Sequence, residues 1–180
     1  MELLITITGL HGVGKTLIGK KLCEYFNLGY SSAGIIFRNI AKEFNMSCAE
    51  FNEYALTHPE IDKKIDGITL ELAKKGNIII EGILSSWITR ELNPFRILLI
   101  APLEVRIQRI AKRDNITFDE AMEITTAREK SERTRFKRLY NIDILEKNIY
   151  DISINTYSFD IDSMIKILTT AINEHKNKKE

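Results

Sequence analysis

The sequence has few of the residues that build disulfide scaffolds or histidine-based metal sites. Its 180 residues include two cysteines, Cys23 and Cys48, and three histidines, His11, His58 and His175. The cysteines do not follow the spacing of a metal or redox motif, so we expect two reduced thiols, as in a cytosolic protein. The histidines are scattered along the chain, which argues against a metal site built on histidine.

The sequence also lacks an excess of charge of one sign and any long apolar run. Lys and Arg number 26 and Asp and Glu 25, for a formal net charge of +1. This balance is not typical of proteins that coat nucleic acid or bind membrane surfaces. No apolar run approaches the length of a membrane span, and the first one begins too early to leave room for a signal peptide. We therefore expect a cytoplasmic monomer with no nucleic-acid or membrane partner.

Internal repeats and low-complexity linkers are absent as well. The length suits one domain with a sizeable core. The end of the chain, residues 175–180, is rich in Lys, Asn and Glu, and we expect it to be a frayed, solvated tail.

Glycine is sparse, yet three of the nine glycines fall in one stretch of eight residues. This stretch reads Gly9-Leu10-His11-Gly12-Val13-Gly14-Lys15-Thr16 and matches G-x-x-x-x-G-K-[ST], the phosphate-binding loop. It follows an apolar β-branched run over residues 3–8 and precedes a segment with helical apolar spacing. Strand, glycine loop and helix are the context that this motif requires.

The residue types of the loop suit a nucleotide triphosphate. Glycines let the backbone turn tightly and bring its N–H groups against phosphate oxygens. The N-terminus of the following helix adds unpaired N–H groups and a partial positive charge. Lys15 supplies a mobile ammonium for the β- and γ-phosphates, and the Thr16 hydroxyl suits Mg²⁺, a hard cation that prefers oxygen ligands.

Apolar runs alternate with helical patterns along the rest of the chain. We expect strands over residues 3–8, in a short segment before 33, and over 78–82, 95–100 and 149–154. Helices are expected after the loop and over 33–44, 60–75, 85–92 and 160–174, with others starting near 47 and 102 and one over 117–140; capping-box patterns begin at Ser47 and Thr117. This order predicts an α/β fold with a three-layer parallel sheet covered on both faces. Residues 31–75 form a helical insertion that could serve as a flap over the site.

Glu81 follows the apolar run Ile78-Ile79-Ile80 at the end of a predicted strand. Ligands of parallel sheets bind at the carboxyl ends of strands. Glu81 is therefore either a solvated strand terminus or a carboxylate aimed into the ligand crevice. The second interpretation fits the acidic residue that phosphate-loop enzymes use near Mg²⁺.

Arginines are the other candidates for phosphate binding, because the guanidinium fork forms paired, charge-assisted hydrogen bonds. Arg109 and Arg113 are four residues apart and therefore share a helix face. Arg128 and Arg135 share another face with Glu132, which lies between them. The alternative is a charged, solvated helix with pairs such as Arg128–Glu132, and we favour that alternative for Arg133 and Arg138. No guanine-reading N-K-x-D motif and no Ser/His/Asp or Cys/His nucleophilic site is present.

Further motifs accompany the loop in a definite order. They are Ser32-Ala33-Gly34-Ile35-Ile36-Phe37-Arg38, Pro59-Glu60-Ile61-Asp62-Lys63-Lys64-Ile65-Asp66, Glu81-Gly82, Ala101-Pro102-Leu103-Glu104-Val105-Arg106, Arg109-Ile110-Ala111-Lys112-Arg113-Asp114, Tyr140-Asn141-Ile142-Asp143 and Tyr150-Asp151-Ile152-Ser153-Ile154-Asn155-Thr156. With these motifs the chain resembles the nucleoside monophosphate kinases, and closely the archaeal type of cytidylate kinase. The resemblance covers nearly the whole length.

The resemblance implies a single kinase domain over residues 1–180. Its core comprises about 1–30, 76–115 and 140–180, with a monophosphate-binding flap at about 31–75 and a short lid at about 116–139. It implies ATP as phosphoryl donor, Mg²⁺ as cofactor and a nucleoside monophosphate as acceptor, with CMP (and dCMP) converted to the diphosphate. The alternatives are a kinase for UMP or AMP, or a nucleotide-binding regulatory protein without transfer activity.

The resemblance also implies roles for individual residues. Lys15, Arg109, Arg128 and Arg135 would act on the transferring phosphoryl group, and the loop residues 9–16 with Arg113 would bind ATP. Thr16 and Glu81 would hold Mg²⁺. Ser32, Gly34, Arg38 and Gly82 would bind the acceptor, with Arg38 clamping its phosphate.

The acceptor side departs from the family pattern at three positions. Ile83 stands where an arginine is common, Ile35 where an acidic residue is common, and Gly67 where an arginine often follows Asp66. Asp62 and Asp66 are candidates for reading the base, because a carboxylate can accept a hydrogen bond from the exocyclic amine of cytosine. Their alternative is a pair of solvated flap charges, four residues apart on a helix.

Overall fold

A five-stranded, entirely parallel sheet forms the centre of the molecule in the computed structural model, which describes residues 2–178. The strands are β1 (Leu4–Thr8), β2 (Gly29–Ser32), β3 (Ile78–Glu81), β4 (Phe95–Ile100) and β5 (Ile152–Asn155), arranged in the order β2-β3-β1-β4-β5. β1 is paired with β3 on one side and with β4 on the other. The predicted α/β fold is confirmed, although the last strand begins three residues later than predicted.

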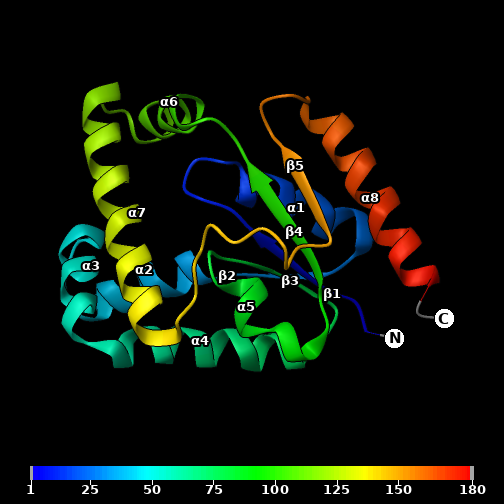
Figure 1. The fold of residues 1–180 in the computed structure, drawn as a ribbon, viewed down its shortest axis with the longest axis horizontal. Helices are drawn as coiled ribbons and strands as arrows, with labels where there is room; N and C mark the ends of the chain where they lie inside the picture. The colour runs from blue at the N-terminus through cyan, green and yellow to red at the C-terminus, as the bar shows by residue number, and fades with distance from the viewer. Residues whose placement is uncertain (1, 179–180) are drawn as a thin grey trace.

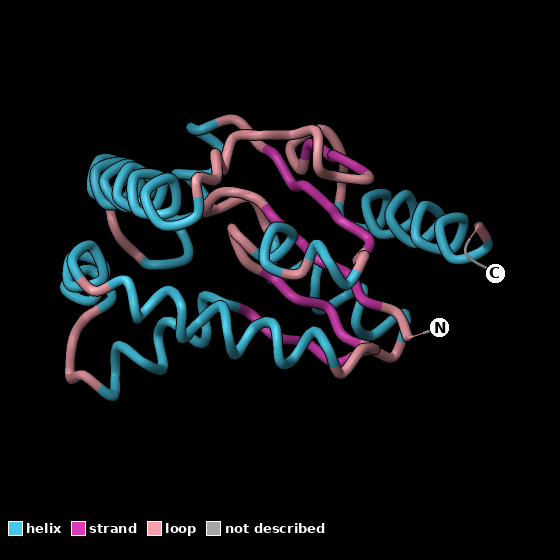
Figure 2. The backbone as a smooth tube through the Cα atoms, turned by 60° about the horizontal axis from the view of Figure 1, so that its bottom comes forward, coloured by secondary structure: helices cyan, strands magenta, loops and turns pink. Residues whose placement is uncertain are grey.

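Helices cover both faces of the sheet, as Figures 1 and 2 show. One layer holds α1 (Lys15–Phe26) and α8 (Ile161–Asn177), and the other holds α4 (Pro59–Lys74) and the short α5 (Ser85–Ile88). Alternating residues of β1 serve the two layers: Ile5 and Ile7 join the cluster with α1 and α8, whereas Leu4 joins the cluster with α4. Burial on both faces explains why β1, β3 and β4 read as continuous apolar runs.

Three helices form the insertion between β2 and β3: α2 (Ala33–Glu43), α3 (Cys48–Thr57) and α4. They share a separate apolar cluster that includes Phe37, Phe51 and Ile61. The predicted capping box at Ser47 is present, since its side chain accepts from the backbone N–H of Glu50 and the Glu50 carboxylate accepts in return. The insertion thus has a small core of its own.

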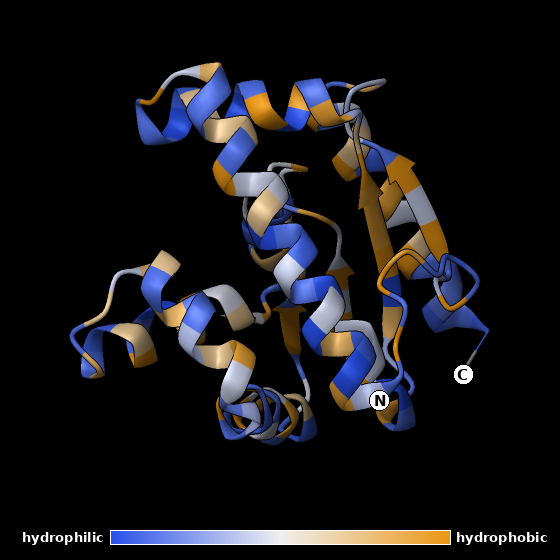
Figure 3. Cartoon of the chain, turned by 60° about the vertical axis from the view of Figure 1, so that its left-hand side comes forward, coloured by the Kyte–Doolittle hydropathy of each residue, from blue (hydrophilic) through white to orange (hydrophobic). Residues whose placement is uncertain are grey.

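Two helices follow β4 and lie toward the carboxyl ends of the strands. α6 (Leu103–Asp114) is joined by a short turn to the long α7 (Phe118–Tyr140), which begins at the predicted capping box of Thr117. α7 runs from α6 to α3 (Figure 1). Figure 3 shows that α7 is mostly hydrophilic, whereas the strands are strongly hydrophobic. α7 therefore carries many polar side chains at the carboxyl ends of the strands.

Two segments differ from the sequence prediction. The helix predicted over 85–92 is divided into α5 and a 3-10 turn, η1 (Arg90–Leu92), at Thr89, whose hydroxyl donates to the carbonyl of Ser85. The predicted frayed tail is wrong for residues 175–177, because α8 continues to Asn177. The ring of His175 packs at 4.9 Å from that of Phe95, whereas Lys176 and Asn177 are exposed, as expected of a solvated segment. Residues 179–180 lie outside the described residues.

Within residues 2–178, no helix combines the length and the apolar composition needed to cross a membrane.

Candidate active site

The phosphate loop follows the central strand β1, at the point where the chain order of the sheet reverses. Gly12 and Gly14 have φ values of 80° and 97°, a region that residues with a Cβ rarely adopt. A Cβ on Gly12 would lie 2.5 Å from the carbonyl oxygen of Arg106, so the loop packs directly against α6. α1 begins at Lys15, which places the helix N-terminus at the loop as predicted.

A cleft of about 730 Å³ opens at the loop and brings together most of the predicted site residues. The predicted residues that line it are His11, Gly12, Gly14, Lys15, Thr16, Ser32, Gly34, Arg38, Asp62, Asp66, Glu81, Gly82, Arg109, Arg113, Arg128 and Arg135. The remaining loop residues, Gly9, Leu10 and Val13, line a second cavity of about 360 Å³.

Lys15 is held by the loop itself. Its Nζ donates to the carbonyl oxygens of Gly9 at 2.7 Å and Leu10 at 3.1 Å, so the ammonium that was expected to be mobile has fixed partners. Burial lowers the pKa of Lys15, while the carboxylates of Glu81 and Glu132 act in the opposite direction. A phosphate group would offer this desolvated ammonium a stronger partner than neutral carbonyls do.

Glu81 is buried at the end of β3, which contradicts the interpretation as a solvated strand terminus. Its carboxylate accepts hydrogen bonds from the hydroxyl of Tyr30 and, at 3.4 Å, from that of Ser32. Tyr30 also interacts with the hydroxyl of Thr16, and burial together with Glu81 raises the pKa of Tyr30. Tyr30 thus connects the two predicted Mg²⁺ ligands, a role that its place in a short predicted strand did not reveal.

Thr16 and Glu81 supply the hard oxygen donors that Mg²⁺ prefers, and they lie beside Lys15 in the cleft. Among the described residues there is no cluster of three or more His, Cys, Asp or Glu side chains able to hold a metal. The donor set therefore fits Mg²⁺ bound mainly through substrate phosphates, and does not fit an all-protein metal cage.

Arg109 and Arg113 lie on one face of α6, but they have different partners. Arg109 donates to the hydroxyl of Thr156 at 2.8 Å and to its carbonyl at 2.9 Å, so it connects α6 to the segment after β5. Arg113 is more exposed and forms a bidentate pair with Asp114, with both contacts at 2.7 Å, which lowers the pKa of Asp114. Arg113 therefore lies at the rim of the cleft.

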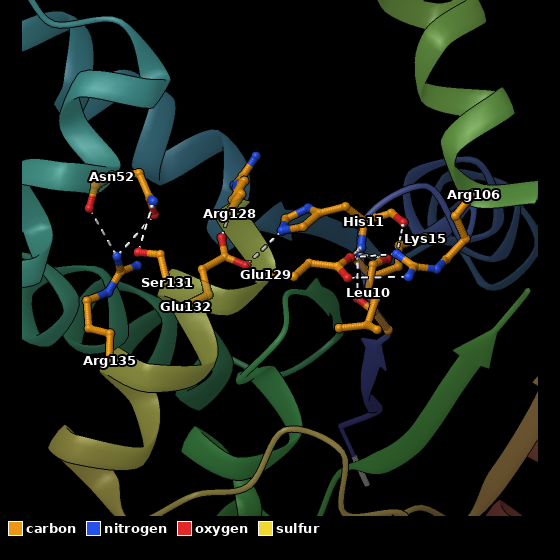
Figure 4. A network of polar contacts seen from close by, with 11 residues as sticks. Leu10, His11, Lys15, Asn52, Arg106, Arg128, Glu129, Ser131, Glu132 and Arg135 are labelled. Atoms are coloured by element: carbon orange, nitrogen blue, oxygen red, sulfur yellow. Dashed lines mark hydrogen bonds and ion pairs between the residues drawn. The ribbon is translucent and has the colours of Figure 1, made fainter. Parts of the chain in front are cut away.

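α7 contacts the phosphate loop through Glu129 and Glu132, of which the sequence had indicated only Glu132, as the partner of Arg128. The Arg106 guanidinium forms an ion pair with Glu129 at 2.5 Å and donates to the carbonyl of His11 at 2.9 Å. Glu132 contacts both Arg128 and the imidazole of His11 (Figure 4). The pair Arg128–Glu132 that the sequence offered is present, but Glu132 is buried and does not lie on a solvated face of the helix.

Arg135 is directed to the helical insertion. It is 2% exposed, its Nε lies 2.6 Å from a carboxylate oxygen of Asp62 on α4, and its Nη1 donates to the side-chain oxygen of Asn52 on α3 at 3.1 Å. Asp62 is itself 4% exposed, so the interpretation of Asp62 as a solvated flap charge is wrong. Asn52 was not recognised from the sequence.

Asp66 and Arg38 line the same cleft from the insertion. Asp66 is partly buried and accepts a hydrogen bond from the hydroxyl of Tyr140, and burial raises its pKa to about 6. Arg38 is exposed, and within residues 2–178 it forms no ion pair. A Cβ on Gly34 would lie 3.4 Å from an Arg38 nitrogen, so the glycine leaves the guanidinium room.

The three positions that depart from the family pattern lie in different surroundings. Ile83 packs against the apolar cluster of Leu84, Phe136 and Ile144 and also lines the cleft. Ile35 is 40% exposed. Gly67 is exposed on α4, with no atom within 4 Å of where a Cβ would stand.

Comparison with known proteins agrees with this geometry. A model of the cytidylate kinase-like family matches residues 4–158. The cytidylate kinase of Methanocaldococcus jannaschii is 44% identical over 177 residues, covering 97% of this chain and 99% of that protein. The cytidylate kinase of Pyrococcus horikoshii is 43% identical over 171 residues, covering 95% and 88%.

Solved structures of lower identity share the fold. Shikimate kinase from Bacteroides thetaiotaomicron superposes with a TM-score of 0.64 at 15% identity, covering 96% of this chain and 99% of that one. Shikimate kinase from Aquifex aeolicus gives 0.61 at 14% identity, covering 97% and 98%. Together with the full-length match to curated sequences, these findings show that the chain belongs to the cytidylate kinase-like family.

Proposed function

We propose that this protein transfers the γ-phosphoryl group of ATP to CMP, forming CDP and ADP, and accepts dCMP as well. The observation that carries the proposal is one cleft that contains both a phosphate loop and Arg38, whose guanidinium forms no ion pair within residues 2–178. The names of the similar proteins support cytidylate as the acceptor. An oxygen of the CMP phosphate forms a bond to the γ-phosphorus, and the bond to the β–γ bridging oxygen breaks as ADP leaves.

The donor wall of the cleft consists of Arg109 and the loop residues that line it: His11, Gly12, Gly14, Lys15 and Thr16. Its backbone N–H groups, the helix N-terminus and Lys15 would bind the triphosphate. On arrival of ATP, Lys15 would exchange its carbonyl partners for phosphate oxygens, a charge-assisted and therefore stronger contact. Arg109 and Arg128 would stabilise the charge on the transferring group.

Mg²⁺ would be held by Thr16 and Glu81, and when bound it neutralises negative charge on the phosphates. Tyr30 keeps the Glu81 carboxylate beside Thr16 through its hydroxyl. The hydroxyl of Ser32 donates to the other oxygen of the same carboxylate. These contacts fix the orientation of Glu81 before any ligand binds.

The acceptor wall consists of Ser32, Gly34, Arg38 and Gly82. Arg38 would bind the CMP phosphate, which is already an anionic nucleophile and needs no strong general base. Asp66 would read the cytosine edge as an acceptor for the exocyclic amine. Asp62, which is paired with Arg135, would contribute only if that pair opens.

Residues 31–75 would act as the monophosphate-binding flap and residues 116–139 as the lid of a single kinase domain. Their closure over the cleft would exclude water, which otherwise accepts the phosphoryl group. α7 makes up most of the proposed lid, and it contacts both the phosphate loop and the insertion.

A coupled ADP-release assay at fixed ATP with CMP, dCMP, UMP, AMP and GMP tests the proposal. CMP should give the highest kcat/KM, because a site that hydrogen-bonds one base edge rejects bases that leave its groups unpaired. A higher value for AMP or GMP would reject the cytidylate assignment and keep the kinase. No acceptor-dependent ADP release would reject both.

A further inference from the structure

His11, the third residue of the phosphate loop, is held at all three of its polar groups by side chains of α6 and α7. Its backbone N–H donates to Glu129 at 3.1 Å, and its carbonyl accepts from Arg106 at 2.9 Å. Its imidazole Nε2 lies 2.7 Å from a carboxylate oxygen of Glu132. The tip of the loop is therefore attached to the lid helix.

Glu132 holds a second nitrogen donor at the same time. Its other carboxylate oxygen accepts from Nε of Arg128 at 2.9 Å, one helical turn away. Glu132 is only 5% exposed. Burial works against ionisation of this carboxyl, but His11 and Arg128 outweigh it and lower the pKa of Glu132 to about 2, so the group is a carboxylate at neutral pH.

His11 and Arg128 each contact Glu132 through one side-chain nitrogen, and their other side-chain nitrogens lie outside that contact. Arg128 uses Nε, and in the part of the chain that the structure describes its two Nη groups form no ion pair. Its guanidinium lies over the ring of Phe37, at 5.9 Å from the ring centre. His11 uses Nε2, which leaves Nδ1 outside the contact with Glu132. Both side chains line the cleft that contains Lys15 (Figure 4).

We propose that Glu132 is a positioning residue for phosphoryl transfer, which fixes His11 from the phosphate loop and Arg128 from the lid helix so that the Nη groups of Arg128 face the terminal phosphate of ATP. The inference rests on the proposed function, since it concerns the donor side of the same reaction. Orientation of a planar guanidinium before the reaction lowers the cost of reaching the transition state.

The negative charge of Glu132 distinguishes positioning from simple donor binding. A carboxylate beside the triphosphate repels it, so Glu132 opposes ATP binding while it orders the groups that act in the transition state. Removal of the charge should therefore lower turnover without weakening the nucleotide. A purely structural ion pair predicts the opposite pattern, in which a loosened site loses nucleotide affinity and turnover together.

The test compares Glu132→Gln with wild type in two measurements: kcat for CDP formation, and the Kd of a non-hydrolysable ATP analogue by calorimetry. We expect kcat to fall by about 10- to 100-fold, with the Kd unchanged or lower. Glu123→Gln, which removes the same charge from an exposed position of α7, is the matched control and should behave as wild type. A kcat within twofold of wild type, or a Kd raised tenfold, would overturn the proposal.

A second variant covers the case in which Glu132→Gln does not fold. His11→Ala removes the other end of the contact from a loop, and Arg128→Gln should then cost several-fold less in kcat than it does in wild type, because its orientation is already impaired. Equal costs of Arg128→Gln in both backgrounds would overturn the proposal. Failure of the wild type itself to form CDP would instead reject the proposed function, which keeps the two failures distinct.

Discussion

On the donor wall of the cleft the polar side chains have partners within the chain, whereas on the acceptor wall Arg38 has no ion pair among residues 2–178. Lys15 donates to loop carbonyls, and Arg109 donates to Thr156. Arg38 is exposed on α2. The donor wall is built on the loop after β1 and on α6. In the acceptor wall, Gly34 and Arg38 belong to the inserted helix α2, whereas Ser32 ends β2 and Gly82 follows β3.

α7 is the element that connects these two regions. Near its middle, Glu132 reaches His11 of the phosphate loop, and three residues later Arg135 reaches Asp62 of the insertion. Any movement of the insertion relative to the phosphate loop must therefore either move α7 or break one of these two contacts. The following variants are chosen to break one region at a time.

Arg135→Met should have the largest effect, and on stability. It removes one partner of a buried ion pair and leaves the charge of Asp62 in the interior. We expect a loss of about 3–5 kcal/mol in the free energy of unfolding, measured by urea titration. Arg133→Met, at an exposed position with a 3.7 Å ion pair, should change stability by less than about 0.5 kcal/mol. Equal effects of the two would show that the pair does not tie α7 to the insertion.

Lys15→Ala should break the donor wall. Loss of the ammonium removes charge stabilisation at the β- and γ-phosphates, and turnover should fall by about 10²–10³-fold. Thermal unfolding should show a folded protein, and Lys20→Ala, an exposed lysine of α1, serves as control. Near-normal turnover would remove the basis for the phosphate-loop assignment.

Arg38→Ala should affect the acceptor wall alone. The lost contact is a hydrogen bond to a charged group, worth about 1.5–3 kcal/mol, so the KM for CMP should rise by about 10- to 100-fold. The KM for ATP should stay within twofold, and so should both constants in Lys42→Ala, which changes an exposed lysine of the same helix. A parallel rise of both KM values would show that the two walls are assigned wrongly.

Asp66 should give the smallest effect, as a pH dependence of stability. Its pKa is about 6 in the folded protein against 3.8 for the free group, because burial disfavours the charge. The folded state then binds the proton more tightly, so the stabilisation is present below about pH 4 and is lost as the pH rises through 6. Because the group is partly exposed, we expect only about 1–2 kcal/mol.

Urea titrations between pH 4 and 7 on wild type and Asp66→Asn measure this component by difference. Glu132 is present in both proteins, so its own loss of stability, which begins as the pH falls toward the ordinary value of 4.5, cancels in the difference. A difference between the two proteins that does not change with pH would contradict the assignment.

Local signals account for what the sequence predicted well. The apolar runs of β1, β3 and β4, the two capping boxes and the glycine loop are each read within a few residues, and each is present where it was predicted. The tail was mispredicted because the packing of His175 on Phe95 is a contact between distant segments. The beginning of β5 was misplaced because the apolar Ile149 precedes the strand itself.

The site was predicted less completely, for the same reason. Helical spacing places Arg128, Glu132 and Arg135 on one face, but it does not indicate what that face meets. His11 and Glu132 are 121 residues apart, and the sequence placed His11 in the phosphate loop without indicating a partner for its side chain. The burial of Asp62 likewise depends on Arg135 from a distant helix.

Transfer of label from ATP to CMP tests the central claim most directly. ATP radiolabelled in its γ-phosphate is incubated with the protein and CMP, and the products are separated by chromatography. The account predicts that the label appears in CDP, with little free phosphate, and that Lys15→Ala abolishes the transfer. Label released as free phosphate alone, with or without CMP, would contradict the account, because the cleft would then bind and hydrolyse ATP without placing an acceptor opposite it.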